Sequence, residues 1–351
     1  MDIADYSKGN GYSKSDLTEN GTPIILYGRL YTKYQFAIAE VDTFATPKDG
    51  SIYSQGNEVI IPASGETAED IARASAVEKS GILLGGDLNI LRPFNFINPL
   101  FLALTISNGE PQKELAKKAQ GKSVVHIHNS DIQEVTVSFP TRAEQDRIVA
   151  VFRSLDNLIT LHQRKVDKLQ QVKKAYLCEM FPENGKTKPK RRFKGFTDDW
   201  EQRKLNEICN YTSSSLTVAN ALNSGNYPLY DANNQIGFVN DFYMPVEYVT
   251  IIKDGAGVGR IRKLDRNTAF IGTMGALTCK NSELKFLYYL LEKKDLSKQY
   301  SGSTIPHIYF KDYGEDKVLV PSVKEQEKLG LYFDNLDNLI TLHQHKQNNI
   351  E

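Results

Sequence analysis

The nonapeptide Leu155-Asp156-Asn157-Leu158-Ile159-Thr160-Leu161-His162-Gln163 recurs without change at residues 336–344, a spacing of 181 residues. The same spacing relates the flanking sequence, because residues 140–165 and 321–346 share 14 identities in 26 positions. Self-similarity at one fixed spacing indicates repeated structural units. We therefore expect the 351-residue chain to consist of two versions of one unit, each about 180 residues long.

The repeat extends upstream into a stretch that contains a small residue followed by a hydroxyl residue. Gly121 and Ser123 in the first copy correspond to Gly302 and Thr304 in the second. His126, Ile127 and Asp131 likewise correspond to His307, Ile308 and Asp312. Because these positions are shared by otherwise different segments, they suit either a contact to the backbone of a nucleic acid or a structural turn, and the turn is favoured.

The repeated region predicts a long amphipathic helix, over residues 142–181 in the first copy. Apolar residues recur there at spacings of four and three, interrupted once by Lys173, which is the a/d pattern of a coiled coil. We expect the two helices to pair as an antiparallel coiled coil that acts as a spacer. The predicted seam includes Phe152, Leu155, Ile159 and His162, and in the second copy Phe333, Leu336, Ile340 and His343. The two histidines share one position, which favours a polar layer that fixes the register of the helices.

Outside the helices, short β-branched runs alternate with turn residues. Strands are predicted at residues 58–61, 124–127, 135–139, 248–252, 269–271 and 318–320, and short helices at 68–77, 99–107 and 284–293. Each half is thus a mixed α/β (α+β) globule followed by a long helix. The predicted boundaries are 1–139 and 196–320 for the globules, 140–181 and 321–351 for the helices, and 182–195 for the linker. Pro23 and Pro228 occupy similar positions before a strand, but the globules differ in length and sequence.

The composition excludes several classes of protein. Apolar residues make up 40% and charged residues 25%, which is typical of globular domains. No apolar run approaches the ~20 residues that a membrane span needs, and the acidic N-terminus lacks a signal-peptide pattern, so we expect a cytoplasmic protein without membrane contact. The three cysteines form neither a zinc pattern nor a disulfide framework.

The net charge is zero, with 43 basic and 43 acidic residues, but the distribution is uneven. Residues 164–204 carry a net charge of +7 between two mildly acidic halves. The basic run at residues 186–194 could contact phosphate groups of a nucleic acid or could simply be a linker, and the linker is favoured.

Four segments together resemble a known family. They are the Pro-x-x-x-Glu-Gln start of each helix, the nonapeptide, the segment Leu177-Cys178-Glu179-Met180-Phe181-Pro182, and the stretch from Arg192 through Phe196 and Trp200 to Leu205. The chain resembles the specificity subunit of a type I restriction–modification system. The resemblance covers nearly the whole chain, and it is most specific in the helices.

The resemblance implies two target-recognition domains, each of which binds one half of a bipartite site on double-stranded DNA. The helices would hold these domains at a fixed distance and dock two methyltransferase subunits, and restriction subunits would join that core. Half-sites one helical turn apart lie ~34–36 Å from each other, within reach of such a helix pair. The subunit itself would be non-catalytic and need no cofactor or metal. S-adenosylmethionine, ATP and Mg are expected on the partner subunits.

Both ends are expected to be shortened relative to the repeat. No segment like Phe196…Trp200…Leu205 precedes the first globule. Glu351 corresponds to Gln170 of the first helix, so the last turns of that helix have no counterpart in the second copy.

Candidate DNA contacts are residues that can bind base edges or phosphates. In the first globule these are Arg29, Tyr31, Lys33 and Tyr34, which interleave basic and aromatic side chains, and in the second they are Asp231, Asn233, Asn234 and Lys253. An exposed turn without DNA contact explains these residues equally well. The eight seam residues named above are the candidates for the spacer and for subunit docking.

Several motifs suggest other functions but lack the required context. Residues 116–123 fit a relaxed phosphate-binding loop, but a polar helix precedes them and a β-branched run follows. Asn98-Pro99-Leu100-Phe101 resembles a methyltransferase motif, and residues 254–259 are better explained by a hairpin than by a cofactor loop. Asp265, Glu283 and Lys285 form only a loose nuclease-like pattern. The main alternative to DNA recognition is a coiled-coil scaffold that binds only protein.

Overall fold

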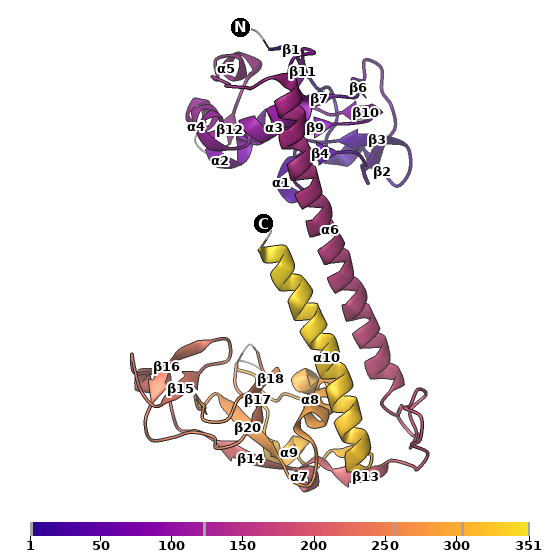
Figure 1. Cartoon of the computed structure of the whole chain (residues 1–351), viewed down its shortest axis with the longest axis vertical. Helices are drawn as coiled ribbons and strands as arrows, with labels where there is room; N and C mark the ends of the chain where they lie inside the picture. The colour runs from indigo at the N-terminus through magenta and orange to yellow at the C-terminus, as the bar shows by residue number, and fades with distance from the viewer. Residues whose placement is uncertain (1–2, 122–123, 256, 303–304, 350–351) are drawn as a thin grey trace. The chain divides into compact units, whose positions relative to one another are not determined.

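A computed structural model describes residues 3–121, 124–255, 257–302 and 305–349. The contacts between residues divide the chain into two compact units, Met1–Asn157 and Leu158–Glu351 (Figure 1). This division falls inside the long helix α6 (Arg142–Glu179), which begins in the first unit and ends in the second. The finer boundaries expected from the sequence remain predictions.

The core of the first unit is built on a five-stranded sheet. Its order is β1 (Ala4–Lys8), β11 (Leu88–Pro93), β7 (Glu58–Pro62), β9 (Ser75–Val77) and β4 (Ala37–Ile38). All neighbours are antiparallel except β4 and β9. Every residue of β7 is buried, which explains the apolar run from Val59 to Pro62. The short strands β8 (Ser64–Gly65) and β12 (Val125–His126) pair beside this sheet.

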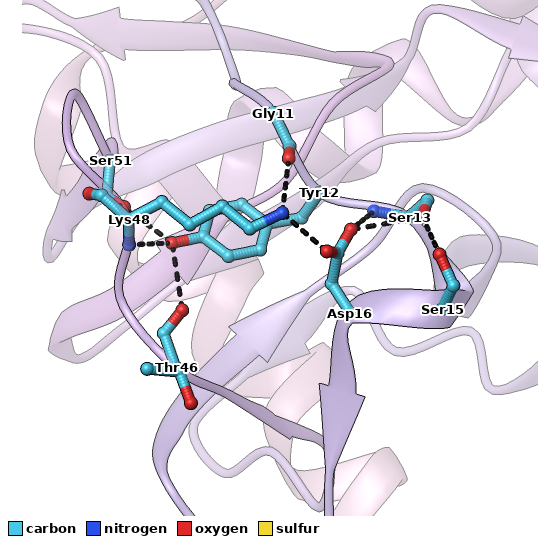
Figure 2. A network of polar contacts seen from close by, with 8 residues as sticks. All are labelled: Gly11, Tyr12, Ser13, Ser15, Asp16, Thr46, Lys48 and Ser51. Atoms are coloured by element: carbon cyan, nitrogen blue, oxygen red, sulfur yellow. Dashed lines mark hydrogen bonds and ion pairs between the residues drawn. The ribbon is translucent and has the colours of Figure 1, made fainter.

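A second sheet of the first unit has the order β2 (Leu17–Thr18), β5 (Phe44–Ala45), β3 (Thr22–Ile25), β10 (Ser80–Leu84) and β6 (Tyr53–Gln55). Two loops next to it are tied together at Lys48 (Figure 2). The Lys48 ammonium pairs with Asp16 and lies 4.9 Å from the centre of the Tyr12 ring. The Tyr12 hydroxyl contacts Ser51 Oγ at 2.5 Å and accepts from the Lys48 backbone N–H at 2.8 Å. The network fixes these loops together with a small apolar cluster of Tyr12, Ile24, Ala45 and Leu83.

Short helices complete the first unit. They are η1 (Lys14–Asp16), α1 (Arg29–Thr32), α2 (Ala68–Ile71), α3 (Pro99–Ile106), α4 (Gly109–Lys118) and α5 (Asn129–Gln133). Figure 1 labels α1 to α5. Asn98 caps α3, since its Oδ1 accepts from the backbone N–H groups of Leu100 and Phe101. Pro99 occupies the first helical position, where its missing N–H has no cost.

The second unit has a four-stranded and a three-stranded sheet. The first is ordered β14 (Cys209–Ser213), β20 (Met274–Cys279), β17 (Tyr248–Ile252) and β18 (Ile261–Leu264). The second is ordered β16 (Gln235–Val239), β15 (Tyr227–Tyr230) and β19 (Ala269–Phe270). A separate pair joins β13 (Glu201–Lys204) to β21 (Lys317–Val320). The helical elements are α7 (Leu205–Ile208), η2 (Val218–Asn220), α8 (Leu284–Lys294), η3 (Leu296–Lys298), α9 (Phe310–Tyr313) and α10 (Val323–Asn348).

The second half of α6 and helix α10 pair antiparallel, as expected from the heptads (Figure 1). His162 of α6 meets His343 near one end of α10, whereas Tyr176, further along α6, meets Tyr332 near the other end. Phe333, Leu336 and Ile340 are buried in this pairing. The prediction of mixed α/β globules followed by an antiparallel helix pair is confirmed.

Lys173, which interrupts the heptad pattern, is an ion-pairing residue. Its ammonium lies 2.8 Å from Asp337 of α10 and 2.9 Å from Glu292 of α8, and its side chain is only 13% exposed. The Tyr289 hydroxyl also donates to Asp337 at 2.7 Å. The apparent break in the seam is therefore a polar link between three helices.

Two predicted elements were wrong. Residues 135–139 form no strand in the first unit, although the corresponding residues of the second unit form β21. The reason is that β21 pairs with β13, and no such partner pairs with residues 135–139 among the described residues. The helix predicted at residues 68–77 ends at Ile71, and residues 75–77 form β9 instead. Pairing with β7 and β4 outweighs the local helical pattern there.

The other expected elements are present. The strands at residues 58–61, 248–252, 269–271 and 318–320 correspond to β7, β17, β19 and β21, and part of 124–127 forms β12. Helices α3 and α8 match the predicted residues 99–107 and 284–293 within one residue.

Candidate nucleic-acid interface

The Gln of each Pro-x-x-x-Glu-Gln motif joins a long helix to its globular part. The Gln145 carboxamide accepts from the Asn98 backbone N–H at 2.8 Å and donates to the Pro140 carbonyl at 2.9 Å. Gln326 makes the same two bonds, to the Glu283 N–H at 3.0 Å and to the Pro321 carbonyl at 2.9 Å. Both glutamines are buried. We call these two groups the glutamine clamps, and they explain why the motif accompanies both helices.

Apart from Lys253, the candidate DNA contacts follow comparable strands in the two units. Pro23 is the second residue of β3 and Pro228 the second residue of β15. Each strand pairs in parallel with a later one, β3 with β10 and β15 with β19. The residues from Arg29 to Tyr34 follow β3, and the turn from Asp231 to Asn234 follows β15. The segments Arg29–Tyr34 and Asp231–Asn234 therefore follow strands with the same parallel pairing in the two units.

In the second unit this turn is held by an aspartate. Asp231 Oδ1 accepts from the backbone N–H groups of Asn233 at 2.7 Å and Asn234 at 2.6 Å. An aspartate that binds the amides two and three residues further on is a typical turn former. Asp231 thus shapes the turn, and the carboxamides of Asn233 and Asn234 are carried at its tip.

Two arginines of the β17–β18 hairpin pack against this turn. Arg260 donates to the Ala232 carbonyl and to Asn233 Oδ1, both at 2.7 Å. Arg262 donates to the Asn233 carbonyl at 3.1 Å, and its guanidinium lies 5.0 Å from the centre of the Tyr230 ring. Neither arginine has a carboxylate partner among the described residues. Their positive charge therefore stays available for an anionic ligand.

Lys253 begins the loop that connects β17 to β18. Its backbone is fixed, because its N–H donates to the Thr273 carbonyl and its carbonyl accepts from Ile308. Within the described ranges its ammonium forms no ion pair. The next residue, Asp254, contacts His307 Nδ1 at 2.7 Å. The loop thus places an unpaired lysine beside an Asp–His pair.

In the first unit, two candidate cations share one carboxylate. Arg29 contacts Asp42 at 2.6 Å, and Lys33 contacts the other oxygen of the same group at 2.5 Å. The two cations hold the pKa of Asp42 well below its usual range. The Arg29 side chain is 9% exposed, and it also donates to Gln35 and to the Glu40 carbonyl. Arg29 therefore fixes the loop that follows α1.

The two candidate tyrosines of the first unit donate to backbone carbonyls. Tyr31 donates to Ser64 and Tyr34 donates to Ala74. Burial raises the pKa of Tyr34, and the Arg73 guanidinium lies 5.8 Å from the centre of its ring. Ser64 pairs with His126 in β8 and β12, which corresponds to the Asp254–His307 bridge of the second unit.

The basic run at residues 186–194 is largely neutralised within the chain. Lys186 and Lys190 both pair with Glu183, and Lys188 pairs with Asp199. Arg191 pairs with Glu179, and Arg192 forms two bonds of 2.7 Å to Glu325. These pairs favour the linker interpretation over a phosphate-binding segment.

The motifs that suggested other chemistry have structural roles. Asn98 is a helix cap that also donates to Asp146, and Glu283 caps α8. Lys285 pairs with Asp334 of α10. The β17–β18 pairing confirms the hairpin predicted around residues 254–259. Lys122, Ser123 and Thr304, which belong to the phosphate-loop and shared-turn predictions, lie outside the described residues.

Sequence reasoning did not identify Arg260 and Arg262 as members of the interface. The alternating sequence Arg260-Ile261-Arg262-Lys263 predicted a strand. Because alternate residues of a strand point to the same face, it also indicates that Arg260 and Arg262 share one basic face. The pairing of that face with a turn nearly thirty residues earlier in the chain depends on tertiary structure. In the described residues no group of three or more His, Cys, Asp or Glu side chains is arranged to bind a metal ion.

Comparison with known proteins identifies the family. The family model for the type I restriction modification DNA specificity domain matches residues 1–171 and 197–351. The chain belongs to this family of specificity subunits. It is 21% identical over 328 residues to the type I restriction enzyme MjaVIII specificity subunit of Methanocaldococcus jannaschii, covering 84% of this chain and 76% of that one.

Solved structures of type I specificity subunits have the same fold. The structure of the S subunit from M. genitalium superposes with a TM-score of 0.68 at 20% sequence identity. The match covers 99% of this chain and 90% of the M. genitalium chain. A chain from a study of complex assembly and conformational transition of the type I restriction–modification system matches 99% of this chain and 94% of its own, with a TM-score of 0.57 at 14% identity.

Membership of the family establishes the general function. The protein is a non-catalytic DNA-recognition subunit, and the family requires no cofactor of its own. These relationships give no support to a scaffold that binds only protein. No helix in the described part of the chain combines the length and the apolar character that spanning a membrane requires.

Proposed function

We propose that the two units of this specificity subunit bind the two halves of a bipartite double-stranded DNA site. The observation that carries the proposal is the internal repeat, in which two glutamine clamps join different globular parts to near-identical helices. Two globular parts carried on repeated helices can each bind one half-site of a bipartite DNA site. Because the loops after β3 and β15 differ, the two half-sites would differ in sequence.

In the second unit, the proposed DNA contact is formed by Asn233, Asn234, Lys253, Arg260 and Arg262, which we call the Arg260 surface. Asn233 Oδ1 accepts a hydrogen bond from Arg260. The side-chain NH₂ group of Asn233 has no hydrogen-bond partner among the described residues. Asparagine and arginine can each make two hydrogen bonds to a base edge, whereas lysine binds phosphate as a point charge. We assign base recognition to Asn233 and Arg260 and phosphate binding to Lys253.

In the first unit, we propose that Lys33 contacts the phosphate backbone, whereas the buried Arg29 holds the loop in shape. Asp42 now holds both cations, and its side chain is 60% exposed, so an incoming phosphate would compete with it for Lys33. Tyr31 and Tyr34 would then keep the loop in place through their bonds to Ser64 and Ala74. DNA binding by this unit should be the weaker and more salt-sensitive of the two.

We further propose that the subunit docks two methyltransferase subunits on equivalent faces of its helices. Leu158 and Leu161 of α6 correspond by the repeat to Leu339 and Leu342 of α10, and all four are between 43% and 59% exposed. Exposed leucines at repeat-related positions suit two copies of one partner. The buried residues Phe333, Leu336 and Ile340, together with Leu155, Ile159 and the two histidines, would serve the spacer.

Restriction subunits would join this core, and S-adenosylmethionine, ATP and Mg would bind to the partner subunits. The adenine methylation and the cleavage would be carried out there. No residue of this chain is assigned to either reaction.

DNA binding of the purified complex of this chain with its methyltransferase tests the proposal. The affinity for duplexes of random sequence should fall steeply as the salt concentration rises. A duplex that carries the sequence methylated by this complex in cells should compete at least about a thousandfold better than a random duplex. Equal competition by all duplexes, with the complex intact, would favour a protein-binding scaffold instead.

A further inference from the structure

Two of the three free cysteines lie directly opposite each other on neighbouring strands of the second unit. Cys209 is the first residue of β14 and Cys279 is the last residue of β20, and the antiparallel register pairs the two. Residues that face each other across an antiparallel pair point to the same side of the sheet. Both cysteines accordingly pack in the hydrophobic cluster that also contains Leu205 and Ile208.

A backbone hydrogen bond next to this pair shows which kind of ladder position it occupies. The Lys280 N–H donates to the Ile208 carbonyl at 2.8 Å. This bond joins the residue after Cys279 to the residue before Cys209, so the two cysteines form a non-hydrogen-bonded pair. The Cα atoms of such a pair lie about 4.5 Å apart, and its side chains approach closely. A disulfide needs Cα atoms about 4.4–6.8 Å apart, so the backbone already allows one here.

The two thiols differ in their access to solvent. Cys209 is 1% exposed, and its Sγ donates to the Leu205 carbonyl at 3.2 Å. Cys279 is half-buried. Burial raises the pKa of Cys209 to about 12 and that of Cys279 to about 11, and a hydrogen bond with Ser282 opposes part of the rise in the pKa of Cys279. Cys279 is therefore the more accessible and the more acidic thiol of the pair.

We propose that Cys209 and Cys279 are a modification site, at which a low-molecular-weight disulfide oxidises the pair to a cross-strand disulfide. The Cys279 thiolate attacks one sulfur of the oxidant, which expels one thiolate and leaves a mixed disulfide on Cys279. The Cys209 thiol then loses its proton and attacks Cys279 Sγ, which expels the second thiolate. The two cysteine thiols are oxidised, and the oxidant is reduced to two thiols that take up both protons.

The burial of the pair sets the conditions under which it reacts. A thiol with a raised pKa is almost entirely protonated at neutral pH, and only the thiolate attacks a disulfide. The pair therefore stays reduced in a reducing compartment, and it oxidises slowly when oxidised thiols accumulate. The same burial shields the finished disulfide from the thiols that would reduce it.

The disulfide closes a loop that contains the proposed DNA contacts of the second unit. Strands β15 to β19 and the Arg260 surface all lie between Cys209 and Cys279 in the sequence. A cross-link restricts the unfolded chain, and its effect grows with the length of the closed loop. The disulfide lies at the end of β20 remote from Lys253, whose N–H donates to Thr273 just before β20. Oxidation thus stabilises the second unit and leaves its proposed DNA contacts in place.

The third cysteine provides a contrast within the same chain. Cys178 is exposed near the end of α6, and neither of the other two cysteines belongs to that helix. An exposed thiol without a neighbouring thiol forms only a mixed disulfide with the same oxidant. The two outcomes differ in mass, because a mixed disulfide adds the thiol of the oxidant, whereas the cross-strand disulfide only removes two hydrogen atoms.

The test uses the full-length chain with Cys178→Ser, which removes the exposed thiol, incubated without denaturant in oxidised glutathione. We expect the intact chain to lose two hydrogen atoms and to carry no glutathione. A tryptic digest without reductant should link the peptide that contains Cys209 to the one that contains Cys279. The unfolding temperature of the second unit should rise by about 5 °C or more, and a reducing dithiol should reverse both changes.

A second substitution in the same background supplies the control. Cys279→Ser removes one thiol from the pair, so oxidised glutathione should cause neither the loss of hydrogen nor the rise in unfolding temperature. Cys209→Ala serves the same comparison from the other strand. Absence of any reaction, or glutathione that stays attached to Cys279, would overturn the proposal. Cross-linking that requires denaturant would overturn it too, because the folded register would then not hold the two thiols together.

Discussion

His162 Nδ1 lies 2.9 Å from His343 Nδ1 across the helix pair, and the two residues are the same member of the repeated nonapeptide. At this distance one ring nitrogen must donate and the other accept, so at most one imidazole can be protonated without repulsion. Desolvation lowers the pKa of His343, and the positive charges of His162, Lys165 and Lys346 lower it further. The pair therefore requires a neutral member.

The first prediction concerns pH. A histidine with a lowered pKa binds fewer protons in the folded than in the unfolded state, so stability rises with pH. The stability of the second unit should thus begin to fall as the pH drops below the unfolded value of about 6.5. Thermal unfolding between pH 5 and 8 measures this. The double variant His162→Gln, His343→Gln should lose most of the dependence in this window, and an unchanged dependence would assign it to other groups.

The second prediction concerns Lys173. Lys173→Met should destabilise the second unit by about 1–3 kcal/mol, because it leaves Asp337 and Glu292 without their shared cation in a partly buried place. Denaturant unfolding gives the free energy. Lys174→Met is the matched control, since Lys174 is exposed, and its effect should stay within about 0.5 kcal/mol. Equal effects of the two variants would contradict the role given to the ion pairs.

The third prediction concerns the glutamine clamps. Gln326→Ala should cost about 1–3 kcal/mol, because the Glu283 N–H and the Pro321 carbonyl lose a buried partner. Gln145→Ala should have a similar cost through Asn98 and Pro140. Hydrogen exchange should locate each loss in its own unit. If either change affected both units equally, the clamps would not act separately.

The fourth prediction separates base recognition from phosphate binding. Asn233→Ala and Arg260→Ala should each cost about 1–3 kcal/mol on the cognate site and relax specificity in one half-site only. Lys253→Ala should weaken binding to all sequences alike and reduce the salt slope by about one. Binding measured at several salt concentrations distinguishes the two outcomes. Loss of specificity in both half-sites would contradict the assignment of one unit to one half-site.

Much of the fold could be predicted because the repeat compares the chain with itself. The heptads identified the helix pair, and the unchanged nonapeptide placed His162 opposite His343. A strand was wrongly predicted at residues 135–139, because the apolar pattern that also predicts β21 does not specify the partner strand on which β21 depends. It also treated Lys173 as an interruption, because its partners Glu292 and Asp337 belong to other helices.

The candidate site was predicted less completely. The turn at Asp231, Asn233 and Asn234 was identified from residue types that favour turns. Its arginine partners were missed, because Arg260 and Arg262 reach it through tertiary packing. In the first unit, the alternation of basic and aromatic residues did not reveal that Asp42 neutralises Arg29 and Lys33.

Single-molecule methylation sequencing of DNA from cells that express this chain with its methyltransferase tests the central claim most directly. The account predicts an N6-methyladenine motif in two specified parts separated by an unspecified spacer. In the Arg260→Ala variant only one of these parts should become degenerate. A continuous motif, or the absence of any motif while the complex still assembles, would contradict the assignment of one half-site to each unit.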